Sequence, residues 1–371
     1  MSVRHIFRFS LLSCKIKVLL LQFVLKLIYM CKVWRILLVM LFPLVLSEIR
    51  VCAQDAPVYE QYVFDNTLLN PAFTGLVDII QVKAAHRQQW TGFGTADGTP
   101  NTTFLLFRSR FKDRDGGLGG FLYNDKNGVN SQTGLQVNGS FQFLMRTKRK
   151  TRTILSFGFG ATVFVHTYDE TRFDRDIYDP IVNYSKKNYF GYDANFGVLL
   201  THGGLLVGLS LNNMLQWTCP VYNVEIERSP SVNMNFHAGK TFWLTSHFQI
   251  SPLLVFKTNM KNLNQMDIGI RVKMLSGNKI RTIYTKDENE VVIGLVYKQT
   301  LDVGNQSPLS ISPMAGMVFK GISVYYLYDI GLTGLQRYNY GTHQISIGFR
   351  MYRDKFTTLD KHNVASMVYD F

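Results

Sequence analysis

Cysteine and charge are both scarce in this chain. Four cysteines occur in 371 residues, and three of them, Cys14, Cys31 and Cys52, lie within the first 53 residues. The one thiol that remains, Cys219, excludes a disulfide framework, a cysteine zinc site or an iron–sulfur cluster within one chain. Charged residues make up 18% and aromatic residues 13% of the sequence, a balance that argues against a disordered protein.

Motifs of common catalytic and cofactor sites are also missing. The sequence contains no Gly-x-Ser-x-Gly, no P-loop, no His-Glu-x-x-His and no EF-hand loop. Residues 276–279 match Ser-x-x-Lys, but they lie in a predicted turn without companion motifs. His166, Asp169 and Glu170 precede an aspartate-rich stretch that is typical of a solvated loop. We therefore predict no catalytic residues, no metal site and no cofactor.

The formal net charge of +14 at first suggests a nucleic-acid-binding protein. Residues 1–53, however, carry eight basic side chains and one acidic side chain, which accounts for +7 of that charge. The rest of the chain has 32 basic and 25 acidic side chains, again +7, spread over a much longer segment. We therefore expect no nucleic-acid partner.

Long hydrophobic runs are confined to the first 53 residues. Residues 18–30 and 36–46 are apolar, and each run is shorter than the roughly 20 residues that a membrane-spanning helix needs. The second run has a basic start and is followed by Val51-Cys52-Ala53, which is the layout of a secretory signal peptide. We predict that residues 1–53 are a leader cleaved before Gln54.

The start of this leader has an alternative reading. Met30 would begin a signal peptide of ordinary length, so we interpret residues 1–29 as an extension upstream of the true start. A true N-terminal membrane anchor is the alternative for the same residues.

From residue 78 onward, apolar and polar residues alternate with period two, as in strands with two unlike faces. In residues 135–146, the odd positions are mostly apolar and the even positions are mostly Gln, Asn and Ser. Residues 343–352 repeat this pattern. The segments are about 10–13 residues long, whereas strands of soluble sheets usually have about 5–6. We count about 14 of them, within limits of 12 and 16, between residues 78 and 352, separated by hairpin-like Gly and Asn pairs.

Two architectures fit long alternating strands. A soluble sandwich turns charged residues toward water, whereas an outer-membrane barrel turns apolar residues toward lipid and small polar residues toward its lumen. The second face here consists of Gly, Asn, Ser, Gln and Thr with occasional Arg or Lys. We therefore predict an all-β fold, a transmembrane antiparallel β-barrel over residues 78–352 after a cleaved signal peptide. Residues 54–77 would form a periplasmic or plug segment, and residues 353–371 a C-terminal extension of open role.

The segment before and within the first strand carries a set of motifs. A tyrosine and an asparagine precede an Asn-Pro-Ala-x-x-Gly element, and an Arg-x-Gln-Trp-x-Gly strand with a following proline and threonine comes next. The residues are Tyr62, Asn66, Asn70, Pro71, Ala72, Gly75, Arg87, Gln89, Trp90, Gly92, Pro100 and Thr103. Over residues 54–110 this sequence resembles the PorP/SprF family of Bacteroidota, which is associated with type IX secretion and gliding motility. Residues 96–99 lengthen one spacing relative to the family.

The resemblance implies a non-enzymatic barrel in the outer membrane, in contact with its lipid. By resemblance, its partners would be a cognate secreted protein with a type IX C-terminal sorting domain, of the gliding or adhesin type, and other secretion-system components. The signature residues would either fix the N-terminal segment and first hairpin or dock a partner. A diffusion porin for small solutes is the alternative function, and an outer-membrane enzyme is a third.

A basic run interrupts the strand pattern between two predicted strands. It contains Arg146, Lys148, Arg149, Lys150 and Arg152. A solvated periplasmic turn, a contact with anionic lipid headgroups and a docking point for an acidic partner are the interpretations left open.

Overall fold

The computed structural model describes residues 60–77, 79–93, 98–111, 115–145, 153–172, 184–217, 231–245, 247–259, 263–276, 289–302 and 306–352. All of them belong to the second of two compact units, residues 51–371. The predictions for the leader, the basic run 146–152 and the extension 353–371 concern residues outside these ranges and stay predictions.

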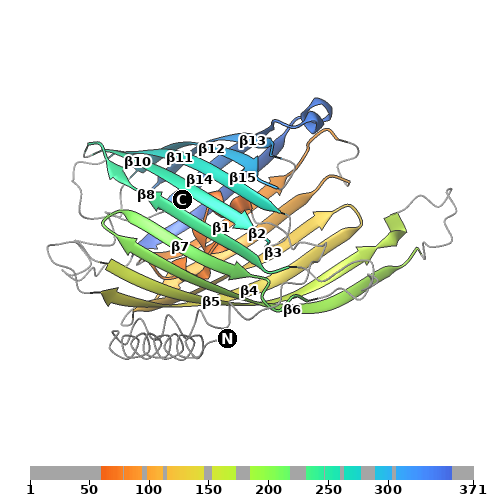
Figure 1. Ribbon diagram of the computed structural model, residues 1–371, viewed down its shortest axis with the longest axis horizontal. Helices are drawn as coiled ribbons and strands as arrows, with labels where there is room; N and C mark the ends of the chain where they lie inside the picture. Colours follow the sequence, from red (N-terminus) through yellow and green to blue (C-terminus); the bar gives the residue numbers. More distant parts are fainter. Residues whose placement is uncertain are drawn as a thin grey trace, which may run out of the picture. The chain divides into compact units, whose positions relative to one another are not determined.

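Antiparallel strands form a single sheet that closes on itself (Figure 1). The strands are β1 (Ile79–Gln88), β2 (Asn101–Arg110), β3 (Gly116–Asn127), β4 (Asn130–Met145), β5 (Thr153–Asp169), β6 (Lys186–His202), β7 (Leu205–Asn212), β8 (Asn233–Lys240), β9 (Phe242–Trp243), β10 (Phe248–Thr258), β11 (Asn264–Ser276), β12 (Asn289–Thr300), β13 (Pro308–Phe319), β14 (Ile322–Gly331) and β15 (Thr342–Tyr352).

Neighbours in the sheet are also neighbours in sequence, and the closure joins the first strand to the last. Ile79 of β1 pairs with Tyr352 of β15, and Gln88 pairs with His343. The two residues of β9 pair with the start of β10. A later stretch of β10 pairs with β8 on the same side. The result is a closed barrel of 14 strands, which confirms the predicted fold and strand number.

The alternation in the sequence corresponds to the two faces of the barrel wall. In β4, Phe141 and Phe143 are 60% and 58% exposed on the outside, whereas Asn138 and Ser140 are 0% and 1% exposed on the inside. An apolar outer face is unfavourable in water and favourable in lipid, so the wall is built for a bilayer. Closure also pairs the strand edges that lipid could not satisfy. In the described part of the chain, no helix combines the length and apolar character that a bilayer crossing requires.

Residues 60–77 precede the barrel in sequence and lie inside it; we call them the lumenal segment. They form three short 3-10 helices, η1 (Glu60–Val63), η2 (Asn66–Leu68) and η3 (Pro71–Phe73). Asp65 caps η2 by accepting a hydrogen bond from the Thr67 amide, and Asn70 caps η3 in the same way. The hydrophobic core lies here, because the apolar side chains of this segment pack on inward-facing residues of the wall.

The barrel has two unlike ends. At the termini end, β1 begins and β15 ends, and two of the turns, 203–204 and 320–321, have only two residues. At the opposite end, which we call the loop end, the connections include residues 170–185, 213–232 and 332–341. The two longest connections, 170–185 and 213–232, lie at the loop end, whereas the termini end has one connection of comparable length to 332–341, residues 277–288.

Candidate functional site

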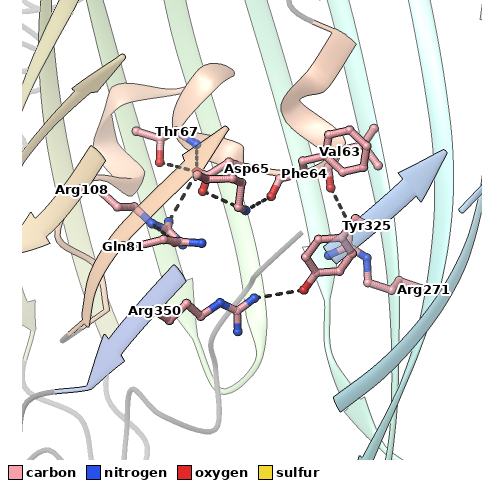
Figure 2. Close-up of polar contacts among 10 residues, drawn as sticks. Val63, Phe64, Asp65, Thr67, Gln81, Arg108, Arg271, Tyr325 and Arg350 are labelled. Carbon is pink, nitrogen blue, oxygen red and sulfur yellow. Dashed lines mark hydrogen bonds and ion pairs between the residues drawn. The ribbon is translucent and has the colours of Figure 1, made fainter. Parts of the chain in front are cut away.

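The lumenal segment is held in the bore by an ion-pair cluster around Asp65 (Figure 2). The Asp65 side chain is fully buried, with Lys83 Nζ at 3.3 Å and Arg108 Nη1 at 3.6 Å from its carboxylate oxygens. Lys83 also donates to the Phe64 carbonyl, and Arg108 Nε donates to Gln81 Oε1 at 2.6 Å. Two cations from β1 and β2 thus converge on one acid of the segment.

Asp65 is also the cap of η2, so one side chain serves both local structure and docking. Its Oδ1 accepts from the Thr67 amide at 3.0 Å and from Thr67 Oγ1 at 2.6 Å. Burial by itself raises the pKa of Asp65, but the charges of Arg108 and Lys83 and the Thr67 hydrogen bonds hold the pKa below its usual value. The group is therefore a carboxylate at neutral pH.

This pKa gives the docking a defined pH dependence. Because the pKa of folded Asp65 lies below the unfolded value of about 3.9, its stabilisation is complete above that value and is lost as the pH falls through the folded pKa. We expect the difference in unfolding temperature between wild type and Asp65→Asn to be constant from about pH 8 to 5 and to shrink below about pH 4. A difference that grows on acidification would contradict the ion-pair assignment.

A second cluster fixes the start of the segment to the opposite wall. Tyr62 donates from its hydroxyl to Asp267 Oδ2 at 2.6 Å, and Lys257 Nζ lies 2.9 Å from the same oxygen. The Lys257 ammonium also stands 4.5 Å from the Tyr62 ring centre, in cation–π contact. Arg271 donates to the Val63 carbonyl at 2.7 Å (Figure 2). Strands β10 and β11 therefore bind η1 through buried polar groups.

The Asn70-Pro71-Ala72 unit docks on the wall through its backbone and small side chains. Asn70 Oδ1 accepts from the Ala72 amide at 2.8 Å, and its Nδ2 donates to the carbonyls of Val198 and Leu209, both at 3.2 Å. Pro71 occupies the first helical position, where its missing N–H costs nothing. The Asn70 side-chain amide therefore makes contacts in two directions, because its oxygen caps η3 and its nitrogen binds carbonyls of β6 and β7.

Inward-facing glycines of the wall make this close approach possible. A Cβ on Gly158 would lie 2.2 Å from the Ala72 nitrogen, and one on Gly197 would lie 1.9 Å from Asn70 Oδ1. Gly75 has φ +69°, and its Cα faces that of Gly117. Side chains at these positions would occupy the volume that the segment fills.

The second half of the signature lies away from the first, at the loop end. The backbone N–H of Gln89 donates to the Pro100 carbonyl at 2.9 Å. Thr103 Oγ1 is 2.8 Å from His86 Nδ1. Arg87 is buried inside the wall and interacts electrostatically with Asp125 of β3. Trp90 and Gly92 begin the connection that follows β1, with φ +49° and +82°.

The structure therefore separates the predicted signature into two groups. Tyr62, Asn66, Asn70, Pro71, Ala72 and Gly75 lie in the lumenal segment, and Arg87, Gln89, Trp90, Gly92, Pro100 and Thr103 lie at the loop end. Their roles in docking a partner stay proposals. The basic residues Arg146, Lys148, Arg149, Lys150 and Arg152 lie outside the described residues.

Sequence reasoning missed the buried charges that hold the segment. Lys83, Arg108 and Asp267 occupy inward positions of alternating strands, which is the one signal that could have found them. Further buried pairs join strand to strand inside the bore, Lys273 with Glu290 at 3.3 Å and Lys298 with Asp329 at 3.1 Å. Among the described residues, no group of three or more His, Cys, Asp and Glu is arranged to bind a metal.

The closed sheet, its lipid-type outer face and its polar lumen define the class of the protein, an integral β-barrel of the outer membrane. Residues 51–349 match the family described as type IX secretion system membrane protein PorP/SprF. The chain belongs to this family, as its N-terminal motifs suggested, and it is a barrel of type IX secretion. A search among curated proteins finds no match.

Several solved barrels are similar to the chain at low identity. The CymD monoaromatic hydrocarbon channel has a TM-score of 0.42 and 9% identity, over 79% of this chain and 94% of that one. A Pseudomonas aeruginosa FadL homologue has a TM-score of 0.39 and 10% identity, over 78% and 90%. The β domain of the Bordetella autotransporter BrkA has a TM-score of 0.36 and 10% identity, over 75% and 100%.

Proposed function

We propose that this protein is a non-enzymatic scaffold that holds a cognate secreted protein at the outer membrane during type IX secretion or surface anchoring. The partner would carry a type IX C-terminal sorting domain, and other secretion components would bind the same barrel. Family membership supports the pathway. The sequence offers no catalytic motif, and the buried lumenal groups Lys83, Arg108 and Asp267 bind the lumenal segment.

One observation carries this proposal over a diffusion porin. Residues 62–76 are almost entirely buried inside the bore and are bound to β1, β2, β6, β7, β10 and β11. A porin needs an open, water-filled lumen, whereas this lumen contains a packed core. In this proposal the barrel serves as the membrane anchor, and its surfaces outside the membrane bind the secreted protein.

The orientation of the barrel follows from its connections. Outer-membrane barrels have short periplasmic turns and longer extracellular loops. We therefore assign the termini end to the periplasm and the loop end to the cell exterior. Within the bore, Tyr62 contacts Asp267 near the loop-end start of β11, and Gly75 lies against Gly117 at the termini end. Periplasmic components would meet the termini end, and a surface protein would meet the loop end.

Two measurements on the purified full-length barrel test this function. In planar bilayers we expect no steady conductance, because the lumenal segment fills the bore. In a pull-down, we expect the barrel to retain a type IX sorting domain from the same organism and not an unrelated secreted domain of equal size. Steady conductance without any bound partner would favour the porin instead.

A further inference from the structure

Two connections at the loop end are joined into one structure. Residues 89–93 follow β1, and residues 332–341, which include η5 (Gly334–Tyr338), connect β14 to β15. Thr91 donates its amide to the Gly341 carbonyl at 3.0 Å, and Tyr340 donates its amide to the Thr91 carbonyl at 2.7 Å. This reciprocal pair of hydrogen bonds fixes the two connections against each other.

Gly92 of the signature makes this junction possible. Its φ is +82°, and a Cβ there would lie 2.3 Å from the Tyr340 ring. The Tyr340 ring therefore occupies the place that any side chain at position 92 would take. Tyr328 fixes the same connection by donating from its hydroxyl to the Tyr340 carbonyl at 2.8 Å.

The joined connections expose four aromatic side chains, which we call the aromatic platform. They are Trp90 at 38%, Phe93 at 45%, Tyr338 at 69% and Tyr340 at 74% exposure. With roughly 200 Å² for each whole side chain, the exposed fractions amount to about 450 Å². That is about half of the roughly 800 Å² that one partner contributes to a standard protein interface.

The platform lies beyond the part of the wall that suits lipid. The outward aromatic residues on the strands below it are Tyr326 and Tyr328 of β14 and His343 of β15, with Tyr326 Oη 2.7 Å from His343 Nδ1. Such amphipathic rings near strand ends match the girdle at a membrane interface. The platform residues sit on the connections that follow β1 and β14, outside the strands themselves.

We infer that the aromatic platform is the surface that binds the secreted partner, an inference that rests on the proposed function. Trp and Tyr are the residues most enriched among those that dominate binding energy, and the hydrogen bonds between Thr91, Tyr340 and Gly341 fix the two connections to each other before binding. The exposed Arg337 next to Tyr338 adds a positive charge. The matching surface is an aliphatic or proline-containing patch with a carboxylate at its rim.

A binding titration with paired variants tests this inference. The probe is a purified type IX C-terminal sorting domain from the same organism, and the receptor is the full-length barrel. We expect Tyr338→Ala with Tyr340→Ala to weaken binding about 30-fold or more, since each ring is a candidate anchor. Tyr338→Phe with Tyr340→Phe should stay within a few-fold of wild type. The control, Phe242→Ala with Phe319→Ala, removes two rings that are 43% and 54% exposed at the termini end and should leave affinity unchanged.

The outcomes separate this inference from the function it rests on. If wild type fails to bind any sorting domain, the proposed function fails and the inference falls with it. If wild type binds and the alanine pair binds equally well, the function stands and the platform assignment is overturned. If the alanine pair instead lowers insertion into lipid vesicles as much as it lowers binding, the rings belong to the lipid girdle and the assignment is also overturned. Gly92→Val, which displaces the Tyr340 ring without deleting it, should weaken binding in the folded barrel.

Discussion

Replacing Asp65 with alanine should release the lumenal segment and open the barrel to ions. The change leaves Lys83 and Arg108 buried without their carboxylate, and removing one partner of a buried pair typically costs about 3–5 kcal/mol. It also removes the cap of η2, worth about 1 kcal/mol. We expect steady conductance in planar bilayers where wild type has none, and heat-modifiable gel mobility that shifts at a lower temperature.

A matched ion pair on the surface provides the control. Asp115 lies 3.2 Å from Arg110, but its side chain is 67% exposed. Exposed pairs contribute about 0–1 kcal/mol, so Asp115→Ala should leave conductance and mobility unchanged. Asp65→Asn separates the two roles of Asp65, because an amide oxygen still caps η2 while the charge is lost. If Asp65→Ala behaves like Asp115→Ala, the ion pairs do not hold the segment.

Replacing Gly158 with valine should displace the same segment by a steric route. The new Cβ would lie 2.2 Å from the Ala72 nitrogen and 2.3 Å from the Pro71 carbonyl carbon, which are backbone atoms without a rotamer to yield. Valine itself suits a strand, so the barrel wall should tolerate it. We expect the lumenal segment to become accessible to protease in the intact barrel, with new cleavage between residues 60 and 77 detected by mass spectrometry.

An outward-facing glycine on the neighbouring strand controls for the general effect of adding a side chain. A Cβ on Gly139 of β4 meets nothing within 4 Å. Gly139→Val should therefore leave the segment protected from protease. Equal protection in Gly158→Val and Gly139→Val would show that the segment does not depend on close contact with the wall.

Agreement between the two variants would be informative because they act by different physics. The Asp65 substitution removes charge complementarity, whereas the Gly158 substitution leaves every charge in place and adds volume. Release of the segment by both would identify the filled bore as the state that these contacts maintain together. That state is the observation on which the proposed scaffold function rests.

The strand pattern could be predicted because apolar and polar residues alternate with period two along each strand. Odd and even positions of β4 differ in chemistry, since one side faces lipid and the other the lumen. The turns could be predicted for a related reason. Gly203 and Gly204 both adopt positive φ between β6 and β7, a conformation that glycine adopts without steric cost.

The clusters in the bore could not be predicted in the same way. Asp65 and Arg108 are 43 positions apart in sequence, and Tyr62 and Asp267 are 205 apart. No local pattern encodes a contact between such positions, since it depends on which strands face each other across the closed barrel. The signature likewise reads as one continuous motif in the sequence, yet one half lies in the lumenal segment and the other half lies at the loop end.

The sequence by itself determined the barrel and its approximate strand number, because alternation along a strand and turn residues act locally. The N-terminal motifs, by resemblance, indicated the family. Only the tertiary structure decided that residues 60–77 fill the bore and that the Tyr340 ring packs against Gly92. Both depend on contacts between parts of the chain that closure of the sheet brings together. The physical reason is that alternation encodes which side a residue faces, and the fold alone sets what it meets there.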